Sequence, residues 1–308
     1  MLIKISIVVI AFYFIYQKLT NNSGLAFSSF TKIITENSIF SAKSIIILSF
    51  LSIFNWFFEI LKWQKLVSAI KNIAFKNALE QTLGSLTASL FTPNRIGEYG
   101  AKAIYYTKTF RKKIMLTNLI SNALQMAVTT FLGAIGCYFF VSKYQMALNT
   151  SKFFIISIFA LFIITLIVFI IRKTKFRFKG FSFEKIKAFV LYYPKSTIAF
   201  GIGYSLLRYA IFSFQFYYLL TLFNINISYF DAMLFITTMY LLASIIPSIF
   251  IFDVVVKSGI AVYLFSFVGI NALTILSIVT IMWLFNFVIP SIFGSYFVLK
   301  FNFPETNP

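Results

Sequence analysis

The chain has 308 residues, of which 60% are hydrophobic, 20% aromatic and only 11% charged. A single water-soluble core of this size cannot enclose so much apolar surface, so the composition excludes a soluble enzyme and indicates a membrane protein. Histidine is absent and Cys137 is the one cysteine, which excludes imidazole bases, metal sites built on histidine or cysteine clusters, and intramolecular disulfides. We therefore expect neither a metal nor a cofactor.

The formal charge is +19, from 27 Lys and Arg against 8 Asp and Glu. Nucleic-acid binding is the weakest explanation of this excess. Basic residues of a multi-pass membrane protein collect in its cytoplasmic loops, where they face anionic headgroups. We therefore expect membrane lipids as partners and no nucleic acid.

Apolar runs predict spanning helices, because about 20 apolar helical residues cross the roughly 30 Å of bilayer hydrocarbon. In chain order these runs are residues 5–17, 44–62, 114–142, 153–171, 209–230, 232–252 and 258–299. The longest hydrophilic stretch lies within residues 172–195. It is predicted to be a basic cytoplasmic loop, too short to form a folded soluble domain.

Residues 76–106 do not behave as a simple span. They are helical and moderately apolar before Phe91, break at TPNRIG and resume as a second short helix, so neither half is long enough to cross. Thr92 as N-cap and Pro93 at the first helical position favour a helix start there. We predict a re-entrant hairpin, because broken backbone is tolerated at membrane depth where protein or a water-filled cavity surrounds it.

A second break falls within residues 232–269 and repeats the pattern of the first. Each break contains a proline, an acid five or six positions later and a lysine four positions after the acid. That order puts the acid and the lysine on one helix face. The matched residues are Pro93, Glu98 and Lys102 in the first break, and Pro247, Asp253 and Lys257 in the second.

The basic residues test this arrangement independently. If both breaks are re-entrant and the other six runs span, 19 basic residues lie on one side and 5 on the other. The positive-inside bias makes the side with 19 basic residues cytoplasmic, and both termini lie on that side. The sequence thus predicts an all-α integral membrane fold, a single transmembrane domain over residues 1–308. It has about six spanning helices and two oppositely oriented re-entrant hairpins whose tips meet near the midplane, as in many transporters.

Charges within the two breaks are candidates for a substrate site. Each costs about 2.5–3.5 kcal/mol at bilayer depth unless it is paired or hydrated, and stability alone is a poor reason to carry it. The alternative is that the lysines snorkel to an interface while the acids cap half-helices. Gly97 and Gly100 flank Glu98 and leave room for a headgroup, although helix packing alone also explains them. The charges in question are Arg95, Glu98, Lys102, Asp253 and Lys257.

A further charge lies in the fifth predicted span. Arg208 shares a helix face with Phe212 and Gln215, so that face is expected to point inward. Its guanidinium either donates to a phosphate or carboxylate or forms an ion pair with a nearby acid. An aromatic belt at the cytoplasmic interface is predicted for Trp56, Glu59, Lys62 and Trp63, which lie at helical spacing.

The stretch TPNRIGEYGAK resembles a hallmark break in the transmembrane region of bacterial lysylphosphatidylglycerol synthases and of their stand-alone, flippase-like relatives. The residues that carry this resemblance are Pro93, Arg95, Gly97 and Glu98. The stretch IIPSIFIFDVVVKSG is similar to the family's second motif through Pro247, Asp253 and Lys257. NWFFEILKWQKL and LLRYAIFSFQ also look like the subgroup without the fused enzyme, and the resemblance covers roughly residues 40–300.

The resemblance implies a bacterial inner-membrane protein that has the lipid-handling half of the two-part synthases and lacks their soluble aminoacyl transfer domain. We therefore expect a flippase-like lipid translocase rather than an enzyme, for a substrate with an anionic or zwitterionic headgroup. Two alternatives stay open: an integral membrane transferase or phosphatase for a lipid-linked substrate, and a non-transporting subunit for a separate lipid-modifying synthase. The candidate substrate-binding residues are Arg95, Gly97, Glu98, Lys102, Arg208, Gln215, Asp253 and Lys257, with Thr92, Pro93 and Pro247 at the helix breaks.

Overall fold

The computed structural model describes residues 9, 41–90, 92, 96–144, 177–178, 181–246 and 250–303, without the side chains of 177–178, 181–183 and 250–253. The predicted span at 153–171 and nearly all of the one at 5–17 therefore lie outside the described residues. So do Pro93, Arg95 and Pro247, and the side chain of Asp253. The described part contains the other four predicted spans and most of both predicted breaks.

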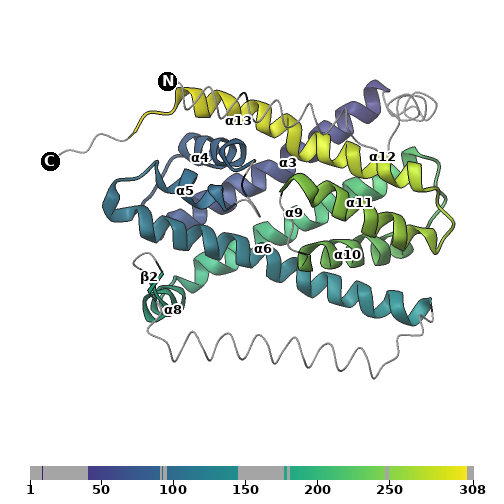
Figure 1. Cartoon of the computed structure of the whole chain (residues 1–308), viewed down its shortest axis with the longest axis horizontal. Helices are drawn as coiled ribbons and strands as arrows, with labels where there is room; N and C mark the ends of the chain where they lie inside the picture. The colour runs from purple at the N-terminus through teal and green to yellow at the C-terminus, as the bar shows by residue number, and fades with distance from the viewer. Residues whose placement is uncertain are drawn as a thin grey trace.

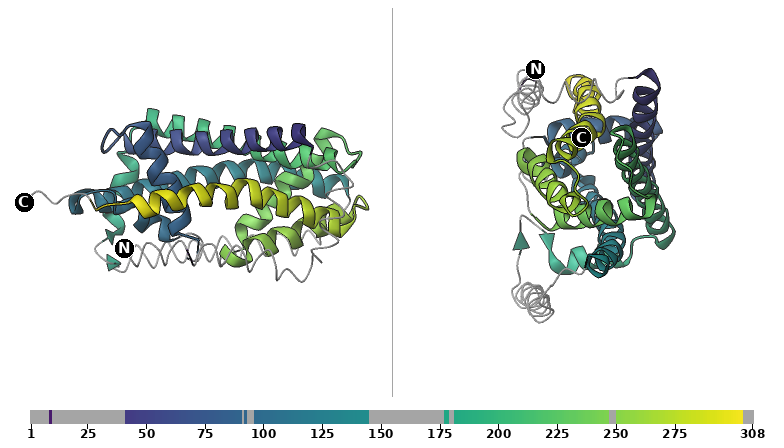
Figure 2. Two further views of the ribbon diagram at one scale, coloured as in Figure 1. Left: turned by 90° about the horizontal axis from the view of Figure 1, so that it is seen from above. Right: turned by 90° about the vertical axis from the view of Figure 1, so that its right-hand side faces the viewer.

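Four long apolar helices run along the long axis of the described part (Figure 1, Figure 2). They are α3 (Ala42–Val67), α6 (Lys108–Lys143), α9 (Lys195–Leu222) and a continuous rod of α12 (Ala272–Trp283), η1 (Leu284–Val288) and α13 (Ile289–Lys300). At 1.5 Å per residue even α3, with 26 residues, is about 39 Å long and exceeds the roughly 30 Å of bilayer hydrocarbon. The chain is therefore a multi-pass helical membrane protein, as its composition predicts.

Both predicted breaks interrupt a helix. The first separates α4 (Phe75–Ala88) from α5 (Gly97–Ala103), and the second separates α10 (Tyr229–Ile245) from α11 (Phe250–Ser266). With 17 residues or fewer, each of these helices is at most about 26 Å long. Figure 1 shows α4 and α5 toward one end of the bundle and α10 and α11 toward the other. The two pairs of short helices thus complete opposite halves of the bundle.

The second half of the first break begins later than the sequence predicted. Helix α5 starts at Gly97, with Ile96 rather than Thr92 as its N-cap residue. The Thr92 hydroxyl nevertheless accepts a hydrogen bond from the Gly97 amide at 2.9 Å, so it still satisfies one of the unpaired N–H groups at the start of the helix. A Cβ at position 97 would lie only 2.8 Å from the Thr92 side chain. A side chain at position 97 would therefore have to displace the Thr92 side chain from this close turn.

Glycines of the long helices let the short helices α4 and α10 pack closely against them. A Cβ at Gly294 of α13 would lie 2.2 Å from the Leu83 carbonyl oxygen of α4, and the Thr87 hydroxyl donates to the Ser291 carbonyl at 2.8 Å. At Gly136 of α6 a Cβ would meet the α10 side chain of Thr237 at 1.8 Å. Small residues at such contacts let helices pack tightly where lipid provides no hydrophobic drive for association. These glycines therefore fix α4 and α10 against the long helices.

Stacked aromatic rings fix α11 against its neighbours. The Phe265 ring of α11 stacks on Phe216 of α9, with ring centroids 5.8 Å apart, and on Phe235 of α10 at 5.0 Å. All three side chains are buried. Offset stacking adds to the apolar contact area that these rings bury. The second pair of short helices is therefore anchored on α9, the helix that carries Arg208.

The predicted basic loop contains regular structure in its described part. Two-residue strands β1 (Arg177–Phe178) and β2 (Phe181–Ser182) pair antiparallel and lead into α8 (Phe183–Leu191). The Tyr193 hydroxyl then donates to the Leu66 carbonyl at the end of α3. This bond ties the end of the loop to the same end of the bundle as α4 and α5, where Figure 1 shows α8.

Candidate functional site

A π-helical turn interrupts the last long helix beside the candidate site. In η1 the Ile289 amide donates to the Leu284 carbonyl, five residues back, which leaves the Phe285 carbonyl without its α-helical donor. Pro290 has no N–H, so the Asn286 carbonyl also lacks its usual partner four residues on. π-Helical turns of this kind occur frequently at functional sites. Here the turn exposes two carbonyl oxygens toward α3.

Two side chains of α3 satisfy these carbonyls. The Ser52 hydroxyl donates to the Phe285 carbonyl, and the Trp56 indole donates to the Asn286 carbonyl at 2.9 Å. The Asn286 side chain accepts from the Asn55 amide at 2.9 Å and donates to the Gln215 side-chain oxygen at 2.7 Å. Asn286 therefore joins α3, α9 and the last long helix in one buried hydrogen-bond network.

Arg208 lies midway along α9 and faces inward, as predicted. Its Nε donates to the Asn55 side-chain oxygen at 3.1 Å, and its Nη1 donates to the Gln125 side-chain oxygen at 3.1 Å. Nη1 also pairs with the carboxylate of Glu59 on α3. The ion pair that was one of the two interpretations of Arg208 is therefore present. The guanidinium is held by both α3 and α6.

Glu59 and its neighbours are buried, so the predicted aromatic belt is wrong. Trp63 is fully buried and Trp56 is only 9% exposed. The Glu59 carboxylate lies 2.7 Å from the Lys62 ammonium group, and both side chains are at least 90% buried. The apolar residues on α3 that face outward are others, including Ile53 and Phe57. This face of α3 therefore packs inside the bundle and carries an ion pair there.

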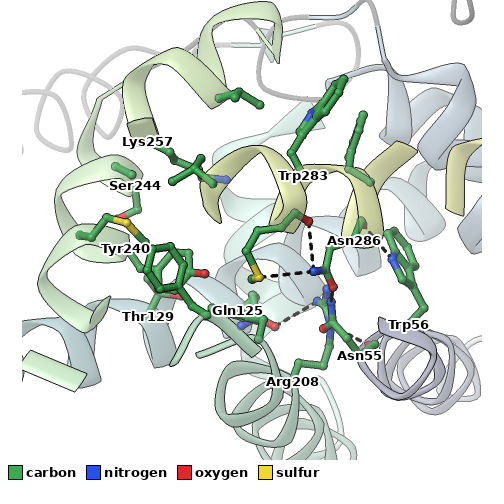
Figure 3. A pocket seen from close by; sticks show the side chains of 18 residues that line it. Asn55, Trp56, Gln125, Thr129, Arg208, Tyr240, Ser244, Lys257, Trp283 and Asn286 are labelled. Atoms are coloured by element: carbon green, nitrogen blue, oxygen red, sulfur yellow. Dashed lines mark hydrogen bonds between the residues drawn. The ribbon is translucent and has the colours of Figure 1, made fainter. Parts of the chain in front are cut away.

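A cavity of about 360 Å³ lies beside Arg208, where six helical elements meet (Figure 3). Its polar wall is formed by Asn55, Gln125, Arg208 and Asn286, and Lys257 of α11 approaches from another side. Among the described residues that line it, Arg208 and Lys257 carry the charges. The rest of the wall is mainly apolar and aromatic, formed by Trp56, Phe212, Phe216, Met239, Tyr240, Ala243, Val254, Val279, Met282, Trp283 and Phe287, with Thr129 and Ser244 as further polar members.

A further ion pair lies outside this cavity, on α5. The Lys102 ammonium is 2.7 Å from the Glu98 carboxylate, which confirms the predicted pairing of residues four apart. Lys102 also donates to the Asn118 side-chain oxygen at 2.9 Å and lies 4.0 Å above the Trp63 ring. Its side chain is fully buried, so Lys102 does not snorkel to an interface, and that alternative is wrong for this residue.

Glu59 lies between Arg208 and the ion pair on α5. It contacts Arg208 and Lys62 directly, and Lys102 is close enough to interact with it electrostatically. The same region is fixed by a shared acceptor on α4, because the Trp63 indole and the Tyr106 hydroxyl both donate to Gln81 at 2.8 Å. The charges of α3, α5 and α9 thus form one buried cluster that reaches the cavity at Arg208.

The predicted site residues do not all lie at one place. Arg208 and Lys257 come together on the cavity wall, whereas Glu98 and Lys102 belong to the charge cluster behind it. Gln215 is fully buried and is not one of the cavity-lining residues. Its side chain accepts from Asn286 and donates to the Leu48 carbonyl at 3.1 Å. The glycines differ as well: a Cβ at Gly97 would crowd the Thr92 side chain, and a Cβ at Gly100 would meet nothing described within 4 Å. Arg95 and the side chain of Asp253 lie outside the described residues.

A family model described as the lysylphosphatidylglycerol synthase TM region matches residues 1–294. The chain belongs to this family. No curated protein and no solved structure matches it. Membership in the lysylphosphatidylglycerol synthase transmembrane family makes this a membrane protein linked to lipid modification, in agreement with the four long helices.

Several residues of this lysylphosphatidylglycerol synthase transmembrane region were missed by sequence reasoning. Asn55 and Asn286 line the cavity and fix each other, yet each is a single amide in an apolar run. One usable signal is Pro290, because a proline four residues after a polar residue in a helix leaves a carbonyl to be satisfied from elsewhere. For Glu59 and Lys62, the spacing in the sequence alone does not distinguish a buried ion pair from an interfacial one.

Proposed function

We propose that this protein is a lipid translocase that moves a lipid with an anionic or zwitterionic headgroup across the membrane. One observation carries the proposal: Arg208 and Lys257, from different helices, line the same cavity, whose wall is otherwise mainly apolar and aromatic. A charged side chain at this depth is costly and is usually retained for function. Membership in a lipid-related family supports the same conclusion.

The chemistry of the cavity suits a lipid headgroup. An arginine presents planar, forked donors that match a phosphate or carboxylate, and a lysine supplies a compact positive charge. Asn55, Gln125 and Asn286 add amide groups on the polar wall, while the aromatic wall is compatible with the apolar part of a lipid. In this proposal Arg208 and Lys257 contact the headgroup, and Glu98 and Lys102 act on it indirectly, through Glu59.

The proposal includes re-entrant hairpins. Helices α4 and α5 form one and α10 and α11 form the other, each entering the bilayer from its own side and turning near the midplane. Their short lengths and their positions at opposite ends of the bundle support this arrangement. Transporters commonly place a substrate site between such inverted elements. With the spans at 5–17 and 153–171 the count of spanning helices is six.

The proposed orientation in a bacterial inner membrane has both termini and residues 172–195 in the cytoplasm. Its support is the excess of basic residues on that side. A single cysteine introduced as Ser182→Cys, with Cys137 replaced by alanine, should not react with a membrane-impermeant maleimide added to intact cells. It should react once the membrane is opened. Labelling of intact cells would contradict the orientation.

Transport by Arg208 variants tests the function. The purified protein is reconstituted into liposomes containing a panel of fluorescent phosphatidylglycerol, phosphatidylethanolamine and phosphatidylcholine lipids, and exposure to an impermeant quencher is followed. We expect Arg208→Gln to slow translocation at least about tenfold, because one lost charge-assisted contact is worth about 1.5–3 kcal/mol.

Arg111→Gln is the matched control. Arg111 lies in the first turn of α6, away from the cavity, and donates to the Tyr106 carbonyl at 3.0 Å. It should leave the rate within about twofold of the wild type. Unchanged transport by Arg208→Gln, or a wild type that moves no lipid of the panel faster than protein-free liposomes, would remove the proposed function.

A further inference from the structure

The guanidinium of Arg208 lies between the cavity and a buried carboxylate. It lines the cavity, and it also pairs with Glu59, which is not one of the cavity-lining residues. The carboxylate of Glu59 therefore partly neutralises the positive charge of Arg208, the charge that would attract an anionic group into the cavity. Glu59 itself is only 9% exposed in its side chain, so solvent screens this effect weakly.

We propose that Glu59 is an internal counter-ion that competes with an anionic phosphate group for Arg208 and so sets how tightly the cavity holds its ligand. The inference rests on the proposed binding of an anionic headgroup at Arg208. An anion in the cavity and the carboxylate of Glu59 share one guanidinium, and like charges on either side of it repel each other. Binding is thereby weakened, as release of a transported lipid requires.

The surroundings of Glu59 allow this exchange at low cost. When an anion draws Arg208 toward the cavity, Glu59 keeps its ion pair with Lys62 at 2.7 Å and its interaction with the more distant Lys102. The carboxylate is therefore not left as an unpaired buried charge, which would oppose the exchange. Since Lys102 belongs to α5, the exchange also changes the field felt at the first break.

The two possible roles of Glu59 give opposite results on mutation. If Glu59 competes with the ligand, Glu59→Gln removes the repelling charge and keeps the shape, and the anion should bind about tenfold more tightly at an effective dielectric constant of about 20. If Glu59 only positions Arg208, the same change should weaken binding. The direction of the change in Kd therefore decides between them.

The experiment measures binding to the purified full chain in detergent micelles. The probes are dioctanoyl phosphatidylglycerol, inorganic phosphate and the uncharged dioctanoylglycerol, and the signal is tryptophan fluorescence, because Trp56 and Trp283 line the cavity. Tighter binding by Glu59→Gln of the phospholipid alone identifies a lipid headgroup as the anion. Tighter binding of inorganic phosphate as well identifies a site for phosphate in general. Dioctanoylglycerol should bind equally to both proteins.

Charge-matched variants complete the test. Glu59→Asp keeps the charge and should bind within about threefold of the wild type, and the double variant Glu59→Gln/Lys62→Gln removes one charge of each sign and should do the same. Lys62→Gln alone leaves more of the Glu59 charge on Arg208 and should weaken binding several-fold. If Glu59→Gln does not fold, the double variant and Lys62→Gln carry the test.

The competition model is overturned if Glu59→Gln binds the anionic probes no more tightly than the wild type, or if Lys62→Gln binds them no more weakly. It is also overturned if the wild type binds neither phosphatidylglycerol nor inorganic phosphate. Its failure is separate from failure of the proposed function. Suppose that the wild type binds phosphatidylglycerol, that Glu59→Gln binds it more tightly, and that no lipid moves in liposomes. The competition model then stands, and the proposed translocase function is contradicted.

Discussion

Replacing Lys102 with alanine is expected to lower the free energy of unfolding by about 3–5 kcal/mol. The Lys102 side chain is fully buried and that of Glu98 is only 6% exposed, so the variant leaves a buried carboxylate without this partner. The contact of the ammonium with the Trp63 ring, at 4.0 Å, is lost as well. Chemical unfolding in mixed detergent micelles, followed by circular dichroism, measures the difference.

An exposed ion pair supplies the control for this substitution. Lys143 lies 2.5 Å from Asp231, but its side chain is 48% exposed. Lys143→Ala should therefore leave the free energy of unfolding nearly unchanged, because solvent screens the pair. Equal effects of the two alanine variants would show that the buried position of Lys102 has no energetic consequence.

A double variant separates stability from function in the same cluster. Lys102→Met combined with Glu98→Gln removes both charges, and apolar or neutral replacements of a buried ion pair are often close to neutral in stability. We expect this variant to regain most of the stability lost in Lys102→Ala. If the cluster serves transport rather than folding, it should still move lipid more slowly than the wild type.

The sequence predicts the breaks and the inward charges well, because each depends on local chemistry. The helix interruption after Ala88 follows from the TPNRIG stretch, and the pairing of Glu98 with Lys102 follows from helical spacing alone. The inward direction of Arg208 follows from the cost of exposing a charge to lipid. None of these predictions needs knowledge of which helices are neighbours.

The cavity itself is beyond local prediction. Its wall is drawn from α3, α6, α9, α10, α11 and the last long helix, with residues from 55 to 287 in the chain. The burial of Glu59 and Lys62 likewise depends on how α3 packs against α4 and α9. A pair of charges between two tryptophans at the end of an apolar run is equally compatible with a membrane interface. Only the packing of distant segments distinguishes the two.

The buried cluster and the cavity are two parts of one electrostatic system. Arg208 belongs to both, and Glu59 lies between Arg208 and the ion pair on α5. We therefore expect a charge that enters the cavity to change the electrostatic potential at Lys102, and a substitution of Lys102 to change the potential at Arg208. If the cavity binds a lipid headgroup as proposed, this coupling lets the motif around Glu98 influence a site that it does not line.

Replacing Asn286 with leucine is expected to destabilise the protein by about 2–6 kcal/mol, because two buried polar groups lose their partner. The Asn55 amide no longer donates to Asn286 at 2.9 Å, and the Gln215 oxygen no longer accepts from it at 2.7 Å. Leaving a buried donor or acceptor unsatisfied costs about 1–3 kcal/mol for each group. The Trp56 bond to the Asn286 backbone carbonyl is retained, so the π-helical turn itself should persist.

The same substitution should also impair the cavity, through Asn55. Asn286 accepts from the Asn55 amide nitrogen, which turns the Asn55 oxygen toward Arg208 Nε at 3.1 Å. Without Asn286 the amide is free to rotate, and Arg208 loses a fixed acceptor. We expect lipid transport in the liposome assay to fall at least about fivefold in protein that is still folded.

Asn122→Leu on α6 is the matched control, because Asn122 donates to Tyr99 through a single 3.3 Å bond. It should cost less than about 1.5 kcal/mol, in the range of one ordinary hydrogen bond, and leave transport unchanged. Equal losses in the two leucine variants would mean that Asn286 does not organise the cavity wall.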